Sequence, residues 1–247
     1  MEYARWAPQY GRIAVAFGYP WEREEAAARL LRSLLPAESR TDPSGRCRAR
    51  VARREAIVVG LAPGAGPPPL HLLAPTTPPR VLLAADGAAA PCLAAGIVPD
   101  LIVTDLDGPV ASEVTANARG ALTVVHAHGD NGEALQKWVP QFNGELVGSW
   151  AGRPADDLID PGGFTDGDRA AYLAEAAGAT SILLWGFSFR QTEGLEGEAR
   201  VRKLRKLAFA EENLQLLAEQ GRTPLLEWRP DGTRRPFHAG AAARSTQ

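Results

Sequence analysis

The segment LIVTDLDGP, Leu101–Pro109, joins a short apolar run to two closely spaced carboxylates. The run Leu101–Thr104 predicts a buried β-strand, and Asp105 and Asp107 follow where that strand ends. Side chains two residues apart on an extended chain point to the same side, so both carboxylates should face one ligand. Neighbouring carboxylates repel each other unless a cation lies between them, and Mg²⁺ prefers oxygen ligands. The segment therefore predicts a strand that ends in a magnesium site. The alternative is that the two aspartates only form a turn and cap the next helix.

Two further polar clusters repeat this pattern. The β-branched run Leu122–Val125 is followed at alternate positions by three polar side chains: His126, His128 and Asp130. The segment GGFTDGDRA, Gly162–Ala170, places Asp166 and Asp168 two residues apart and leads into a stretch that favours helix. Either aspartate could be the N-cap of that helix. Caps do not require histidines and paired carboxylates at successive strand ends, so the three clusters together favour one shared site.

Apolar runs alternate with segments of helical character along most of the chain. Six runs predict strands: residues 56–60, 81–85, 101–104, 122–125, 145–149 and 182–186. Four intervening segments predict helices: residues 91–95, 111–119, 132–138 and 168–177. None of the runs alternates between polar and apolar residues, which is typical of parallel strands covered by helices on both faces. We therefore expect an α/β fold with a doubly wound, mostly parallel sheet.

The carboxyl ends of these strands should carry the site, because ligands of open α/β sheets bind there. Most of the candidate polar residues are expected at that edge: Asp86, Asp105, Asp107, His126, His128, Asp130 and the loop after Trp185.

The flanking segments differ from this α/β pattern. Trp21–Leu35 predicts an amphipathic helix, and we interpret residues 1–45 as a small N-terminal helical cap, 46–240 as the α/β catalytic domain and 241–247 as a disordered tail. A long helix is predicted over Glu196–Gly221, with an apolar stripe on one side. We interpret its basic cluster as a solvated face: Arg200, Arg202, Lys203, Arg205 and Lys206.

The composition limits the possible functions. The chain has 247 residues, of which 45% are hydrophobic, enough for one large core. A net charge of −2 argues against a nucleic-acid-binding surface. Two isolated cysteines suit a reducing, cytoplasmic setting, and the sequence contains neither a signal peptide nor an apolar run of membrane-spanning length. A homodimer is the expected oligomer, because cyclic dimers are the commonest assemblies.

A glycine-rich segment, GLAPGAGPPP, follows the first predicted strand at Gly60–Pro69. Backbone N–H groups in such loops can contact phosphates, since glycine allows close approach. Gly60, Gly64 and Gly66 are therefore candidates for nucleotide binding, although the segment matches neither a Walker sequence nor a dinucleotide fingerprint.

Four motifs together resemble the archaeal 6-hydroxymethyl-7,8-dihydropterin pyrophosphokinase family. They are TDLDG at 104–108, HAHGDN at 126–131, GGFTDGDRA at 162–170 and the GF-S-F segment at 186–189. The motifs occur in family order across residues 57–210. There is a looser similarity to thiamine pyrophosphokinases, which implies an α/β catalytic domain like theirs. The chain departs from the family at its first glycine loop, where a compact Gly-x-Gly-Pro-Ser run is usual.

This resemblance implies Mg²⁺-dependent transfer of a diphosphate from ATP to the hydroxymethyl group of 6-hydroxymethyl-7,8-dihydropterin, with release of AMP, in the biosynthesis of tetrahydromethanopterin or folate. Asp105 and Asp107 would bind Mg²⁺, with Asp130 or Asp166 as a further ligand. The implied catalytic residues are His126, His128, Asp166, Asp168 and Arg169. The implied nucleotide or pterin contacts include Asp86, Gly87, Gly129, Asp130, Asn131 and Gly163. Such a transfer depends on positioning and on neutralising charge, which these residue types can supply.

Alternative interpretations share some of these residues. The TDLDG motif is similar to the nucleophile motif of haloacid-dehalogenase phosphatases, but Pro109 stands where that family has threonine. HAHGDN is similar to the metal motif of metallo-β-lactamase-type hydrolases, but Asn131 replaces its last histidine. A thiamine-pyrophosphokinase-like enzyme and a non-catalytic nucleotide-binding module remain as alternatives.

Overall fold

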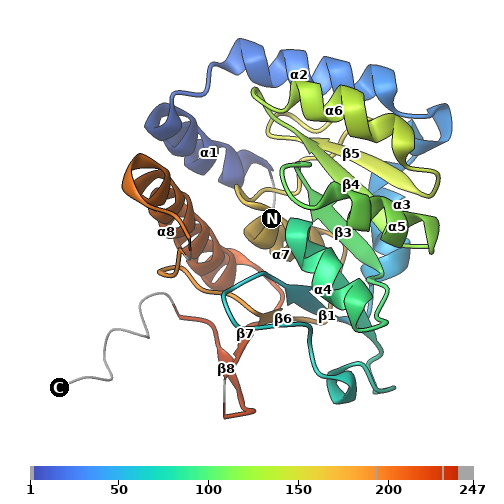
Figure 1. Ribbon diagram of the computed structural model, residues 1–247, viewed down its shortest axis with the longest axis vertical. Helices are drawn as coiled ribbons and strands as arrows, with labels where there is room; N and C mark the ends of the chain where they lie inside the picture. The colour runs from blue at the N-terminus through green and yellow to red at the C-terminus, as the bar shows by residue number, and fades with distance from the viewer. Residues whose placement is uncertain (1–2, 193, 230, 239–247) are drawn as a thin grey trace.

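The computed structural model describes residues 3–192, 194–229 and 231–238, and the tail predicted at 241–247 lies outside them. These residues form an eight-stranded sheet in the order β5-β4-β3-β2-β1-β6-β7-β8 (Figure 1). Neighbouring strands are parallel, except for the antiparallel β7–β8 pair. The strands are β1 Glu55–Val59, β2 Arg80–Ala85, β3 Leu101–Thr104, β4 Leu122–Ala127, β5 Leu146–Trp150, β6 Ser181–Trp185, β7 Leu225–Trp228 and β8 Arg234–Pro236. The predicted fold class is confirmed.

Successive side chains of the central strands enter cores on opposite faces of the sheet. In β1, Ala56 and Val58 join one core cluster, while Ile57 and Val59 join another. Every residue of β1, β3 and β4 is buried, as expected for strands with helices on both sides. Because both faces of these strands are buried, their sequences do not alternate between polar and apolar residues.

Helices cover both faces of the sheet. The helices are α1 Tyr3–Phe17, α2 Trp21–Leu34, α3 Pro43–Val51, α4 Ala89–Ala94, α5 Val110–Ala118, α6 Gly132–Trp138, α7 Asp166–Ala176 and α8 Gly197–Gln220. Short 3-10 turns lie at 37–40, 70–72, 86–88 and 139–141. Buried residues of α1, α3, α7 and α8 share one core cluster, and those of α2, α4, α5 and α6 belong to the two clusters on the other face.

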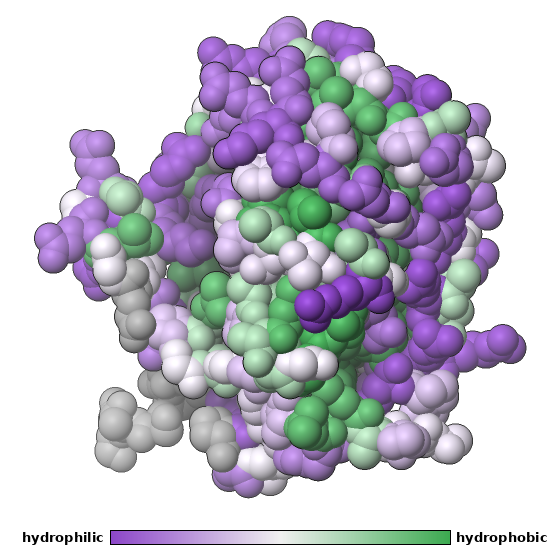
Figure 2. All heavy atoms as spheres, turned by 45° about the vertical axis from the view of Figure 1, so that its right-hand side comes forward, coloured by the Kyte–Doolittle hydropathy of each residue, from purple (hydrophilic) through white to green (hydrophobic). Residues whose placement is uncertain are grey.

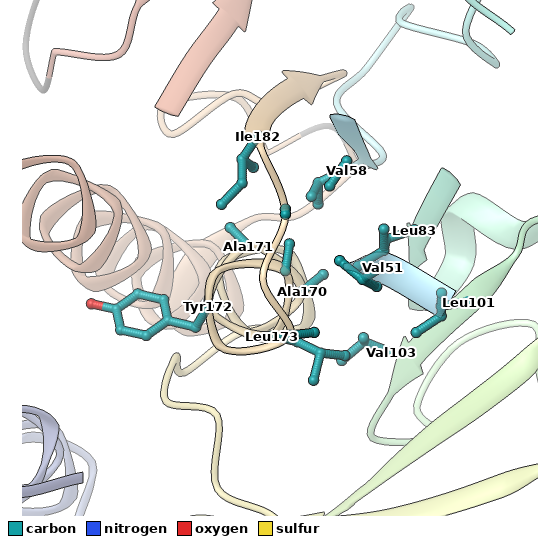
Figure 3. Packing of buried hydrophobic residues seen from close by; sticks show 14 of the residues in the cluster. Val51, Val58, Leu83, Leu101, Val103, Ala170, Ala171, Tyr172, Leu173 and Ile182 are labelled. Atoms are coloured by element: carbon teal, nitrogen blue, oxygen red, sulfur yellow. The ribbon is translucent and has the colours of Figure 1, made fainter. Parts of the chain in front are cut away.

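Helix α7 lies at the centre of the sheet face that α1, α3 and α8 also cover. Ala170, Ala171 and Leu173 face strand side chains such as Val58 and Val103, as Figure 3 shows. The small alanines let this helix pack closely against the sheet, which fixes the position of its N-terminal end at the site.

The N-terminal segment is continuous with the α/β core. Helix α3 runs across the boundary predicted at residue 45. Trp6, Tyr10 and Ile13 of α1 are buried in the same cluster as the strands. Residues 1–45 therefore supply part of the main core, among those the structure describes.

The direction of strand addition reverses beside β1. Strands β2 to β5 extend the sheet on one side of β1, and β6 to β8 extend it on the other. Such a switch point opens a crevice between the loops that leave the two central strands. Here those loops begin at Gly60 and Gly186, which predicts a ligand site between them.

The visible surface is mixed in character. Figure 2 shows hydrophilic residues around the edge of one face and hydrophobic residues grouped through its middle. Among the described residues, none of the helices combines the length and the hydropathy that crossing a membrane requires.

Candidate active site

Three carboxylates meet at the carboxyl ends of β2 and β3. Asp86, Asp105 and Asp107 can each offer one oxygen such that these atoms all lie within 4.8 Å of one another. The sequence predicted the pair Asp105 and Asp107, but it placed Asp86 at the pterin or ribose edge. The third acidic group at this position is Asp86, because the loop after β2 lies directly beside the loop after β3.

The backbone between the two predicted ligands is a turn and not an extended chain. Leu106 has a left-handed φ of 68°, and its N–H donates to Thr104 Oγ1 at 2.9 Å. Such a conformation is uncommon for a bulky residue and is held here by burial. Gly108 is required nearby, because a Cβ there would overlap the Asp86 carboxylate. The two aspartates therefore converge through a tight turn, and the geometric reason given from the sequence was wrong.

The acidic cluster is electrostatically suited to a cation. Burial and the neighbouring carboxylates Asp105 and Asp86 raise the pKa of Asp107 to about 6. Burial and the same two carboxylates also raise the pKa of Asp166. Behind the cluster, burial and Asp86 raise the pKa of Glu113 to about 9. Repulsion of this kind is relieved by a hard divalent cation, so the three-carboxylate set fits Mg²⁺.

The two predicted histidines have opposite character. His128 lies between Asp105, 3.4 Å from its Nε2, and Asp130, 2.6 Å from its Nδ1. Burial disfavours its charge, but the two carboxylates outweigh this and raise the pKa of His128 to about 9. Burial and the nearby Arg169 lower the pKa of His126, whose Nδ1 lies 3.1 Å from Ser149 Oγ. The pair therefore consists of one cationic and one neutral imidazole.

Asp130 was predicted as a metal ligand, but it lies outside the acidic cluster. The ring of His128 separates its carboxylate from Asp105, and its side chain is 54% exposed. Its role in this geometry is to hold His128 in the charged state.

Asn131 and Gly129, predicted as ligand contacts, tie together loops of the site. Asn131 Nδ2 donates to the backbone carbonyls of Asp105 and His126, and its Oδ1 accepts from the His128 N–H. The Gly129 N–H donates to the buried carboxylate of Glu24 at 3.1 Å. Both residues position the strand ends, since their polar groups are used within the protein.

Asp166 and Asp168 separate into two roles. Asp166 lines the cavity that contains the acidic cluster. Asp168 is fully buried and completes a capping box with Thr165 at the start of α7. It also accepts hydrogen bonds from the Phe164 N–H and from Asn213 Nδ2. The alternative of an N-cap role thus describes Asp168, whose predicted catalytic role this geometry does not support.

Arg169 is a buried cation with unused hydrogen-bonding capacity. Its side chain is 2% exposed, and Nη2 donates to the Phe164 carbonyl at 3.0 Å. Within the part of the chain that the structure describes, Nε and Nη1 have no hydrogen-bond partner. Arg169 lines a small cavity together with Asp105, His128 and Lys206. Buried N–H groups without partners are costly, which favours an anionic ligand here.

Helix α8 supplies basic residues that the sequence analysis assigned to solvent. Lys203 and Lys206 line the cavity of about 260 Å³ that contains the acidic cluster. Lys206 also lines the cavity of Arg169. The five basic residues of α8 look alike in sequence, and only the packing of the helix shows which two face the site.

The predicted glycines are spread over the site and its supports. Gly60 and Gly87 line the cavity that contains the acidic cluster, and Gly64 lines a second cavity that adjoins it. The Gly66 carbonyl accepts a hydrogen bond from Trp185 Nε1. Gly163 packs against the backbone of Arg169, so that a side chain there would clash with α7.

Much of the chain, including the segments that form the site, is similar to known proteins. Residues 40–194 match the family described as 6-hydroxymethylpterin diphosphokinase, MptE-like. The chain belongs to the MptE-like family. The match includes all three acidic and histidine-containing motifs, so the family resemblance seen in the sequence is confirmed.

Two curated relatives cover nearly the whole chain. The 6-hydroxymethyl-7,8-dihydropterin pyrophosphokinase of Pyrococcus furiosus is 36% identical over 237 residues, 92% of this chain and 99% of that protein. The protein of the same name from Methanothermobacter thermautotrophicus is 33% identical over 239 residues, 92% of this chain and 100% of that protein. A crystal structure of thiamine pyrophosphokinase from Bacillus subtilis covers 70% of this chain and 60% of its own, with 14% identity and a TM-score of 0.33.

Proposed function

We propose that this protein transfers a diphosphate from ATP to the hydroxymethyl group of 6-hydroxymethyl-7,8-dihydropterin and releases AMP. The observation that carries the proposal is one cavity in which the carboxylates of Asp86, Asp105 and Asp107 lie opposite Lys203 and Lys206 of α8. A metal–triphosphate needs both kinds of charge, and the MptE-like family supplies the acceptor.

Asp86, Asp105 and Asp107 would hold Mg²⁺, which neutralises phosphate oxygens when it is bound. Asp166 lies close enough to influence these carboxylates electrostatically, and we assign it to the outer part of the same site. This replaces Asp130 in the set of ligands proposed from the sequence.

The cationic groups would bind the phosphate oxygens and stabilise the charge that develops during transfer. Arg169 offers two N–H groups, and His128 and Lys206 line the same small cavity. A fixed, partly desolvated set of donors is more effective than water at this task. The acceptor oxygen bonds to the β-phosphorus, the bond from that phosphorus to the bridging oxygen of AMP breaks, and the hydroxyl proton is released. Neutral His126 lines the same small cavity, and its imidazole is available there for hydrogen bonding to the acceptor.

The test is to offer ATP and MgCl₂ with the reduced pterin alcohol, and separately with thiamine, and to identify the nucleotide released. We expect AMP and the pterin diphosphate, with thiamine unreacted. Release of ADP would indicate an ordinary kinase, reaction of thiamine alone would favour a thiamine-pyrophosphokinase-like enzyme, and binding of ATP without turnover of either acceptor would favour a non-catalytic module. The Asp107→Asn variant is the control for contaminating activity.

A further inference from the structure

A second and larger cavity adjoins the acidic one at the switch point of the sheet. Its volume is about 650 Å³, which is in the range of small-molecule sites. The two cavities share the walls formed by Ala62, Pro63 and the loop 186–189. A molecule in the larger cavity would thus contact residues that also line the cavity of the acidic cluster.

Aromatic rings form much of its lining. Phe187, Phe189 and Phe237 make a continuous series, with ring centroids 6.2 Å and 6.0 Å apart. On another part of the lining, Trp185 and Trp228 are in contact, with centroids 5.6 Å apart. Ring surfaces of this kind suit a flat heterocycle, because offset and edge contacts between rings are favourable.

A carboxylate and a guanidinium lie together in the same lining. Glu227 of β7 forms an ion pair with Arg229, and the two side chains are only 22% and 29% exposed. Arg229 Nε is buried and, over the described ranges, has no hydrogen-bond partner. The cavity lining therefore includes carboxylate acceptors beside a guanidinium whose N–H groups are not all used within the described part of the protein.

We propose that this cavity binds the pterin ring of the acceptor, with Glu227 accepting hydrogen bonds from the 2-amino group and N3–H and with Arg229 donating to the 4-oxo group. The assignment rests on the proposed function and identifies its acceptor site. The hydrogen-bonding edge of a pterin lies at the opposite end from C6, so this orientation leaves the hydroxymethyl group directed away from Glu227. Adenine fits less well, because its N6 donor is flanked by the acceptors N1 and N7, which a carboxylate repels.

The test measures binding and not turnover. The stable, fluorescent 6-hydroxymethylpterin is titrated against the wild-type protein and against Glu227→Gln. The same titrations use 6-hydroxymethyllumazine, in which an oxo group replaces the 2-amino group. Hydrogen bonds to a charged group are strong, so the wild type should bind the pterin at least about tenfold more tightly than the lumazine. That preference should fall to about threefold or less in Glu227→Gln if Glu227 reads the amino group. The matched control is Glu212→Gln, which removes a carboxylate from the exposed ion pair with Arg12 on the outside of α8.

The outcomes separate the two proposals. A wild-type preference for the pterin that is unchanged in Glu227→Gln would overturn the cavity assignment alone. The same conclusion follows if Glu227→Gln weakens Mg–ATP binding and leaves pterin binding intact, since the cavity would then hold adenine. Wild-type protein that binds Mg–ATP but no pterin would overturn the proposed function itself. A second variant, Phe189→Leu, should weaken the pterin and the lumazine equally, because it removes a ring surface that both ligands share.

Discussion

Replacing Asp107 with asparagine should make the metal-free protein more stable and at the same time inactivate it. Asp107 lies within 4.8 Å of two other carboxylates, and the cationic His128 beside the cluster is paired with Asp105 and Asp130. Asparagine keeps the shape of the side chain and removes one of the three charges. The same change removes a ligand of the proposed metal, so stability and activity should move in opposite directions.

The size of the stabilisation follows from Coulomb's law. Two unit charges 4.8 Å apart repel by about 0.9 kcal/mol in water-like surroundings, which are appropriate for an exposed side chain. Asp107 has two such neighbours, and salt screens part of the repulsion, so the net gain is about 1–2 kcal/mol. For a chain of this length that corresponds to a rise in Tm of about 2–8 °C. Turnover should fall by about a hundredfold or more, because the metal supplies several kcal/mol of charge stabilisation.

The assay is thermal unfolding in EDTA and in excess MgCl₂, together with AMP release. In EDTA, Asp107→Asn should melt above the wild type at pH 8, and added salt should reduce the difference. MgCl₂ should raise the Tm of the wild type and have a smaller effect on the variant. Asp156→Asn, in the exposed part of the connection between β5 and α7, is the control for a general effect of removing an aspartate. A variant that is less stable than the wild type in EDTA, or that responds equally to MgCl₂, would refute the assignment of a repulsive cation site.

Four other substitutions test individual residues of the site and of its surroundings. Arg169→Lys should lower turnover by about a hundredfold while far-ultraviolet circular dichroism stays unchanged, and it should weaken inhibition by pyrophosphate, because lysine cannot replace two guanidinium donors. Asp168→Asn should lower the free energy of unfolding in urea by about 2 kcal/mol, because it disrupts the capping box. Asp166→Asn should lower turnover with little loss of stability. The reverse pattern would contradict the different roles assigned to the two aspartates. Burial raises the pKa of Asp160 to about 7, so the folded state retains a proton that the unfolded state has lost. The contribution of Asp160 to the free energy of unfolding therefore becomes less favourable as the pH rises from about 4 to about 7. Over that range the stability of Asp160→Asn relative to the wild type should increase by up to about 4 kcal/mol. The increase would be absent if Asp160 were ionised throughout.

The positions of six strands were predictable, because burial on both faces of the sheet leaves each of them as an unbroken apolar run. The run Leu101–Thr104 coincides with β3, and the other five predicted strands differ from the structure by one or two residues at their ends. Strands β7 and β8 were not predicted, because only the first residue of β7 is buried and polar residues interrupt both. Helix α1 was also missed, since it contains Pro8 and its buried residues Trp6 and Tyr10 carry polar groups.

The site was predictable where sequence spacing reflects spatial proximity, and not where it depends on neighbouring strands. The pair Asp105 and Asp107 lies within one motif, so its closeness was predicted, although the turn at Leu106 that brings it about was not. Asp86 joins them only because β2 lies beside β3, and Asp130 lies apart from them because the His128 ring is between it and Asp105. Lys206 could not be distinguished from the other basic residues of α8 without the direction in which that helix packs.

Helix α8 contributes both to the cavity and to the hydrophobic core, so one rigid element sets the positions of both groups of side chains. Lys206 lines the cavity, and Leu214 and Leu217 of the same helix are fully buried. A single inserted residue between Lys206 and Leu214 would turn the lysine by about 100° relative to those leucines. The spacing of this segment should therefore tolerate substitutions but no change in length.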